Sequence, residues 1–108
     1  MNKQMLATRE KAFAPLIALY QFEIEEAVTN ANECEVGLGA FIMTENIARS
    51  WRVTEALEVS MVGVNLDLLS ACENPFGSVK QSGYGREESR QGIEEYMVVK
   101  SMLISVPS

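Results

Sequence analysis

Short apolar runs alternate along the chain with stretches in which apolar residues recur every three or four positions, and this alternation predicts an order of strands and helices. The first run, residues 16–22 (LIALYQF), follows Pro15 and is typical of a buried strand. A helix is predicted to follow it, because the next apolar residues fall on one helical face. These residues are Ile24, Ala27, Val28 and Ala31.

The middle of the chain predicts a strand, a helix and another strand. Residues 39–43 (GAFIM) form a second apolar run that ends at Thr44, a residue suited to the N-cap of the next helix. That helix is expected over residues 45–58, where apolar or small residues form one stripe. The stripe consists of Ile47, Ala48, Trp51 and Thr54. Residues 60–65 (SMVGVN) then predict a third short strand.

The last third of the chain predicts a long loop, a helix and a final strand. Residues 66–85 show no periodicity, and loops of this length are often functional. A helix is predicted over residues 86–96. Gly92 inside it costs about 1 kcal/mol relative to alanine, so close packing is expected at that position. Residues 97–106 (MVVKSMLISV) predict a terminal strand that needs a sheet to join.

This order of elements predicts an α/β fold with a mostly parallel sheet and flanking helices, because strand–helix–strand units form right-handed crossovers. A parallel sheet needs helices on both of its faces. The three predicted helices are too few to cover the predicted strands. Residues 1–108 are therefore expected to be part of a larger domain.

The composition is that of a globular protein, and it narrows the classes of partner. Of the 108 residues 47% are hydrophobic, and the net charge is -6. Nucleic acids and anionic lipids bind clustered Lys and Arg, so this acidic balance argues against both partners. No apolar run approaches the length of about 18 residues that spans a membrane. The first residues lack the pattern of a secretory signal, and a reducing compartment, cytoplasmic or mitochondrial, is expected.

The residue inventory restricts the chemistry. Histidine is absent from the sequence, which excludes Ser-His-Asp and Cys-His catalysis and most zinc hydrolase sites. Cys34 and Cys72 lie far apart without the CxxC spacing of a redox or zinc site, so no metal is expected. Both are interpreted as structural thiols. Carboxylates, Lys, Tyr and the thiols remain, and a complete enzyme is hard to assemble from them.

Residues 75–87 (PFGSVKQSGYGRE) are the most informative segment of the chain. Glycine tolerates positive φ and admits close approach by backbone or ligand. This loop, with Phe76 at its head, is therefore suited to form the wall of a pocket. The alternative is a plain connecting loop.

From about Met5 to Ser101 the sequence resembles the C-terminal part of the aldehyde dehydrogenase superfamily, most closely the succinate-semialdehyde dehydrogenases. Five segments in the same order carry the resemblance. They are residues 13–15 (FAP), 36–41 (VGLGAF), 51–65 (WRVTEALEVSMVGVN), 75–87 (PFGSVKQSGYGRE) and 92–96 (GIEEY).

The resemblance implies an NAD- or NADP-dependent oxidation of succinate semialdehyde to succinate, through a thiohemiacetal on a catalytic Cys. In the family the nucleophile, the general-base Glu and the dinucleotide-binding domain all precede the region that this chain resembles. Cys34 and Cys72 do not occupy the nucleophile's position. No catalytic residue is therefore expected here, and the chain alone is predicted to be inactive.

On the cofactor side, the resemblance implies that Phe13 packs beside the nicotinamide ribose. Lys11 stands where the family has a Glu that accepts hydrogen bonds from the ribose hydroxyls, and a Lys cannot accept them. Ala14 replaces a family Gly in the same turn, which restricts the backbone if φ is positive. Both departures weaken the expected contact with the cofactor.

On the substrate side, the resemblance implies that the Ser70 hydroxyl holds the far carboxylate of the substrate and that Phe76 lines the same pocket. The partner arginines of that carboxylate lie upstream in the family. Ser78 replaces the second Gly of the usual PFGG segment. The alternative for Ser70 is a local hydrogen bond to backbone in the loop.

Two further alternatives remain from the sequence. In the family the final strand joins the sheet of a neighbouring subunit, so residues 97–106 are expected to act in oligomerisation. The chain would then be a non-catalytic interaction module that docks on full-length aldehyde dehydrogenase subunits, or a homo-oligomer. The other alternative is that the chain does not fold stably alone, because apolar surfaces would be exposed.

Overall fold

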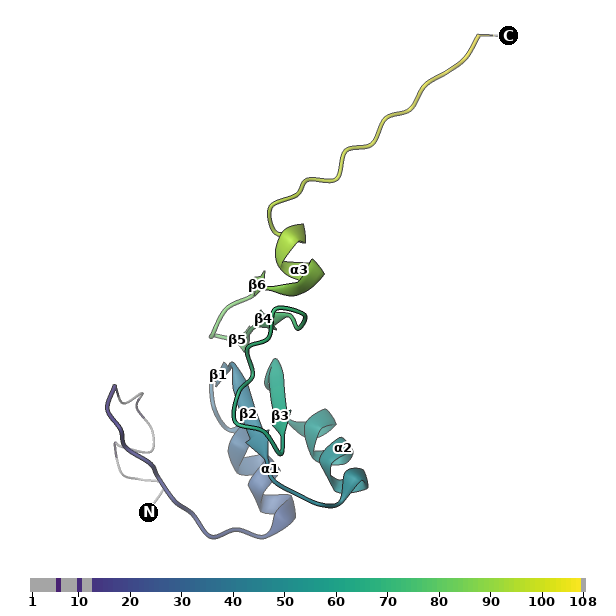
Figure 1. Ribbon diagram of the computed structural model, residues 1–108. Helices are drawn as coiled ribbons and strands as arrows, with labels where there is room; N and C mark the ends of the chain where they lie inside the picture. Colours follow the sequence, from purple (N-terminus) through teal and green to yellow (C-terminus); the bar gives the residue numbers. More distant parts are fainter. Residues whose placement is uncertain (1–5, 7–9, 11–12, 108) are drawn as a thin grey trace.

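The three helices that the structure describes are separated along the chain by short strands, and each helix falls where the spacing of apolar residues predicts one. The computed structural model describes residues 6, 10 and 13–107. Their elements are, in order, α1 (Ile24–Asn32), β1 (Val36–Gly37), β2 (Gly39–Ile42), α2 (Ile47–Ala56), β3 (Met61–Val64), β4 (Phe76–Gly77), β5 (Val79–Lys80), β6 (Arg86–Glu87) and α3 (Ser89–Glu94). The three predicted helices are confirmed with shorter bounds, and the chain is α/β (Figure 1).

The longest strand pair is parallel and joins β2 to β3, with Gly39 opposite Met61 and Ile42 opposite Val64. Helix α2 is the connection between the two strands, as parallel neighbours require a crossover. A Cβ at Gly63 would lie 2.9 Å from Cδ1 of Phe41, so glycine lets the strands and the following loop pack closely. Met61 is the only buried apolar side chain among the described residues.

Asn65 extends the pairing of β2 and β3 beyond their last residues. Its backbone N–H donates to the carbonyl of Ile42 at 2.9 Å. Its side-chain amide donates to the carbonyl of Thr44 and accepts from the N–H of Thr44, both at 2.8 Å. The backbone of Asn65 has a φ of 55°, a conformation that Asn tolerates better than most residues.

The N-cap of α2 is Asn46, and the prediction of Thr44 is wrong. Asn46 accepts a hydrogen bond from the N–H of Arg49 through its side chain at 2.9 Å. The hydroxyl of Thr44 instead accepts from the N–H of Asn46 at 3.2 Å. The backbone of Thr44 is hydrogen-bonded to Asn65. The N-cap position is therefore taken by Asn46, which directly precedes the helix.

Strands β4 and β5 lie within residues 66–85, which the sequence predicts as irregular, and each takes part in a short antiparallel pair. Strand β1 pairs with β5, and β4 pairs with β6, each over two residues. Parallel pairing within the described residues is thus restricted to β2 and β3. The sequence correctly predicts an α/β chain. The antiparallel pair of β1 and β5 joins residues distant in sequence, which a local pattern does not reveal.

Two apolar runs that predict strands are not strands in the described part of the chain. Residues 16–22 form an irregular exposed segment, in which the side chain of Ile17 is 79% exposed. Residues 97–106 extend away from the other elements as a tail, and Val99 is 98% exposed (Figure 1). An apolar strand is stable when a neighbouring strand satisfies its backbone and covers its side chains. The described residues supply such a neighbour to neither run.

The described residues form an elongated body rather than a closed one. The radius of gyration is 19.5 Å, whereas a compact domain of this length would have roughly 13 Å. Much of the apolar surface is exposed, including Ile47 and Trp51 on the predicted stripe of α2. No helix in this part of the chain is long and apolar enough to cross a membrane.

Candidate functional site

Arg86 closes the glycine-rich loop that the sequence singles out. Its Nη1 donates to the carbonyl of Ser78 at 2.9 Å, of Tyr84 at 3.0 Å and of Gly85 at 2.8 Å. Because Nη1 carries two N–H groups, at least one of them is shared between two of these carbonyls. The loop is therefore organised around one side chain of its own segment.

Glycine is required at two positions of this loop for two different physical reasons. At Gly77 a Cβ would lie 2.5 Å from Cδ of Arg86 and 2.7 Å from the carbonyl oxygen of Gly85, so close approach excludes any side chain. Gly83 has a φ of 136°, which side chains with a Cβ rarely allow. The predicted uses of glycine, positive φ and close packing, are both confirmed.

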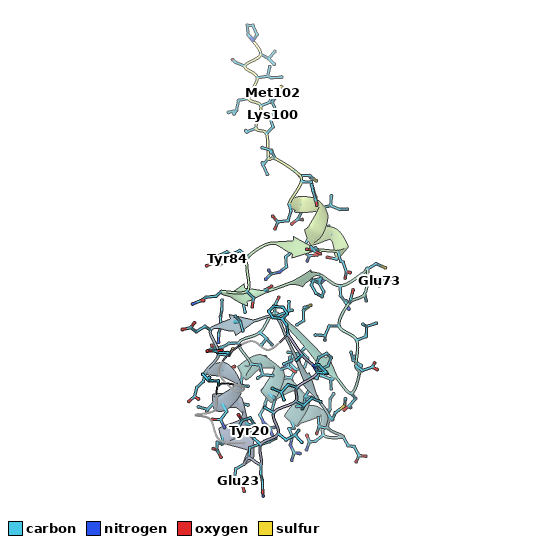
Figure 2. All side chains as sticks on the ribbon, turned by 90° about the vertical axis from the view of Figure 1, so that its left-hand side faces the viewer. Tyr20, Glu23, Glu73, Tyr84, Lys100 and Met102 are labelled. Atoms are coloured by element: carbon cyan, nitrogen blue, oxygen red, sulfur yellow. The ribbon has the colours of Figure 1, made fainter. Side chains whose placement is uncertain are left out.

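An open hollow of about 260 Å³ lies on the loop and is lined by Phe76, Tyr84, Arg86 and Glu95 among others. Phe76 is half-buried there, while Tyr84 projects outward and is 91% exposed (Figure 2). A second hollow of about 420 Å³ continues past Arg86 to Glu88 and Tyr96. Phe76 therefore borders a depression, as a pocket-lining residue should, but the depression is open to solvent.

Ser70 does not line either hollow, and its hydroxyl makes a hydrogen bond that the sequence does not predict. It donates to Oε1 of Glu88 at 2.8 Å. Phe76 lines the first hollow and Glu88 lines the second. Ser70 therefore reaches this part of the surface through its hydrogen bond to Glu88. The expected alternative, a local hydrogen bond from Ser70 to backbone, is replaced by one to a carboxylate 18 residues away.

Glu88 is the residue of this region that the sequence misses. The predicted helix over residues 86–96 includes it, whereas α3 begins at Ser89 and Glu88 precedes it with a φ of 57° and a ψ of 176°. No pattern of apolar residues signals such a break. Gly92, in contrast, is packed as predicted, because a Cβ there would lie 2.9 Å from the carbonyl carbon of Glu87.

Phe13, the described member of the two predicted cofactor residues, does not line the hollows at this loop. Its side chain is 91% exposed. Lys11 lies outside the described residues. The roles of both residues therefore stay predictions.

The two cysteines are free and exposed, and their interpretation as structural thiols stays a prediction. Each contributes its backbone rather than its sulfur to the contacts found. The carbonyl of Cys72 accepts from the N–H of Ser89 at 3.0 Å, and that of Cys34 accepts from Lys80 at 3.0 Å. The described residues contain no cluster of three or more His, Cys, Asp or Glu side chains that could hold a metal.

Lys80 fastens the loop to the first helix. Its Nζ donates to the carbonyls of Asn32 and Cys34 at 3.0 Å and lies 2.6 Å from Oε2 of Glu58. The backbone of Lys80 has a φ of 55°. This contact fixes the middle of the glycine-rich loop against the α1 side of the molecule.

Comparison with known proteins identifies the class. The family model described as "Aldehyde dehydrogenase family" matches residues 1–102. The human protein named "Succinate-semialdehyde dehydrogenase, mitochondrial" is 48% identical over 101 residues, which are 93% of this chain and 19% of the relative. The Schizosaccharomyces pombe protein "Succinate-semialdehyde dehydrogenase [NADP(+)] 1" is 48% identical over 102 residues, 94% of this chain and 20% of the relative.

A solved structure extends this similarity to the fold. The NAD+ complex of an aldehyde dehydrogenase from Bacillus cereus matches with a TM-score of 0.94 and 31% identity, over 99% of this chain and 22% of that chain. The helices and strands of this chain are thus arranged as in the matching part of that aldehyde dehydrogenase. This chain belongs to the aldehyde dehydrogenase family. The chain spans about one fifth of the length of the curated relatives that it matches.

Proposed function

We propose that this chain supplies the C-terminal part of an NAD- or NADP-dependent aldehyde dehydrogenase that oxidises succinate semialdehyde to succinate. The observation that carries the proposal is the 48% identity to a succinate-semialdehyde dehydrogenase over 93% of the chain. In this proposal Ser70 and Phe76 contribute to the substrate pocket, and Phe13 contributes to the nicotinamide site. An aldehyde is accordingly the proposed small-molecule substrate.

The residues fit a supporting role in the site. The side chain of Phe13 is an aromatic ring of the kind that can pack on a ribose, and it is 91% exposed. Phe76 offers apolar surface at a hollow that Arg86 also lines. When bound, NAD or NADP accepts a hydride from the substrate. This chain's residues then bind and orient, while the nucleophilic Cys and the general base come from outside the 108 residues.

The chain alone is proposed to be inactive. Oxidation of an aldehyde by this route requires a positioned thiolate and a donor set for the developing oxyanion, and separate reactants lose the advantage of proximity. Purified chain mixed with succinate semialdehyde and NAD or NADP should give no reduced cofactor by absorbance. Appreciable turnover would show that the 108 residues are a sufficient enzyme.

Complementation in trans tests the proposal itself. A human succinate-semialdehyde dehydrogenase that lacks its matching 101 residues would be coexpressed with this chain and assayed. Restored oxidation of succinate semialdehyde, lost again without the chain, is the expected result. If the two polypeptides associate and no aldehyde is oxidised, the proposed contribution to the active site is wrong.

A second candidate function is a non-catalytic module that docks on full-length aldehyde dehydrogenase subunits, or on a second copy of itself. The exposed tail of residues 97–106 favours it, because an unpaired apolar segment can add as a strand to another chain's sheet. Figure 2 shows Lys100 and Met102 on this tail with no other element beside them. Copurification of the chain with an intact dehydrogenase would support this function.

The compartment is part of the same proposal. Because the human relative is named as mitochondrial, we propose that the protein of which this chain forms a part acts in mitochondria or in the cytoplasm. Cell fractionation with an antibody against the chain would test this location. Recovery from the secretory compartments would contradict it.

A further inference from the structure

Glu88 has an unusual backbone for a residue with a long side chain. Its φ is 57° and its ψ is 176°, which lies outside the left-handed helical region and in a region used almost only by glycine. Such conformations persist where the surrounding structure holds them, and they gather at functional sites.

Three hydrogen bonds hold the turn at Glu88. The Ser70 hydroxyl donates to its Oε1 at 2.8 Å, and the N–H of Gly92 donates to its backbone carbonyl at 2.8 Å. The N–H of the next residue, Ser89, donates to the carbonyl of Cys72 at 3.0 Å. The loop at residues 70–72 is thus fastened to residues 88–89 by a side chain and by the backbone.

The second carboxylate oxygen of Glu88, Oε2, is buried and accepts no hydrogen bond from the described residues. A buried carboxylate oxygen without a donor is unfavourable, so this arrangement is not the one that stability alone would select. It leaves a negative group with unused acceptor capacity directly beside Ser70.

A serine hydroxyl has a single proton to donate. In this structure Ser70 gives that proton to Glu88. A carboxylate approaching Ser70 from outside would have to displace Oε1 and would also meet the negative charge of Glu88. Two carboxylates that share one donor repel each other.

We propose that Glu88 is a specificity-determining residue that acts through Ser70. The Glu88 carboxylate accepts the only proton that the Ser70 hydroxyl can donate. Ser70 then binds a carboxylate of the substrate less well, and the binding preference at Ser70 shifts towards an uncharged group. The inference rests on the proposed function, because it takes Ser70 to face the substrate. It adds that Glu88 weakens the binding of the far carboxylate of succinate semialdehyde, so that an aldehyde with an uncharged far end competes better at this site than it would without Glu88.

The test is a titration of the full chain, labelled with 15N, with succinate and with its neutral diamide as probes. The native chain would be compared with the variants Glu88→Gly and Glu88→Gln, and shifts of the Ser70 amide would be followed. Glu88→Gly removes the carboxylate and suits the positive φ, so it should bind succinate about tenfold more tightly, as expected for loss of a competing charge-assisted contact. Binding of the diamide should change little.

Glu88→Gln keeps an acceptor for the Ser70 hydroxyl and removes only the charge, so its gain should be smaller than that of Glu88→Gly. The matched control is Glu87→Gln, which makes the same change of net charge at the neighbouring exposed residue. It should bind succinate like the native chain. Adding Ser70→Ala to Glu88→Gly should remove the gain, because no hydroxyl is left to donate.

The inference is overturned if Glu88→Gly binds succinate no better than the native chain, including the case in which neither responds. It is also overturned if Glu87→Gln gives the same gain, since the effect would then be one of overall charge. The titration involves no turnover and no second polypeptide. Its failure is therefore distinguishable from failure of the complementation experiment, which tests the proposed function.

Discussion

Lys80 and Glu58 form an ion pair in which Nζ and Oε2 lie 2.6 Å apart, and the same Nζ donates to two backbone carbonyls of the α1 side. Lys80 is 23% exposed at its side chain and Glu58 is 60% exposed. An exposed pair contributes little by itself. The carbonyls are what make Lys80 the more important partner.

Replacement of Lys80 by Met should therefore lower the free energy of unfolding by about 1–2 kcal/mol, because two carbonyls lose a charged donor. Glu58→Gln should lower it by less than about 1 kcal/mol. Urea unfolding followed by circular dichroism measures both. Lys100→Met, on the exposed tail, is the control and should have no effect. Equal losses at Lys80 and Glu58 would mean that the ion pair dominates.

A methyl group at Gly92 should destabilise the chain although alanine favours helices. The gain in helix propensity is about 1 kcal/mol, but the new Cβ would lie 2.9 Å from the backbone carbonyl carbon of Glu87, which cannot move aside cheaply. We expect Gly92→Ala to have a net cost of about 1–3 kcal/mol. Gly85→Ala is the matched control, since nothing lies within 4 Å of its Cβ position. A stabilised Gly92→Ala variant would contradict close packing at Gly92.

Asn65 offers a test of the extension of β2 and β3. Asn65→Gly keeps a residue that accepts positive φ and removes both side-chain hydrogen bonds to Thr44, so a loss of about 1 kcal/mol is expected. Asn65→Ala adds backbone strain and should lose about 1 kcal/mol more. Amide hydrogen exchange at Thr44 should accelerate in both variants. Unchanged protection at that amide would show that the side chain does not extend the pairing.

The exposed tail should associate with other chains by strand pairing if it acts as proposed. Met102→Pro removes one backbone N–H and fixes φ, so it should abolish copurification with an intact aldehyde dehydrogenase. Met102→Ala, which removes the same side chain but keeps the N–H, should retain most of the association. Loss of association in both variants would instead assign the contact to the side chain.

The sequence predicts the helices and the β2–β3 pair because their apolar residues recur with a local period. It overpredicts strands at residues 16–22 and 97–106. An apolar run indicates that a segment is stabilised by burial, but it does not show whether the same chain provides the neighbouring strand that buries it. The two-residue strands β1, β4, β5 and β6 are too short to leave a period.

The candidate site also has parts that the sequence predicts and parts that it does not. The importance of residues 75–87 can be predicted from their glycines, because positive φ and close approach restrict the residue type. The clamp by Arg86 is less evident, since an arginine at a loop end has many acceptable partners. The contact of Ser70 with Glu88 joins residues 18 positions apart through a backbone break that no periodicity marks.

The exposure of Trp51 makes α2 a built-in optical reporter. It is the only tryptophan of the chain and its side chain is 68% exposed. An indole ring emits at longer wavelength in water than in apolar surroundings, so any polypeptide that covers this helix should shift the emission to the blue. The assembly of this chain into a larger enzyme can thus be timed by intrinsic fluorescence, without a label and before any catalytic assay.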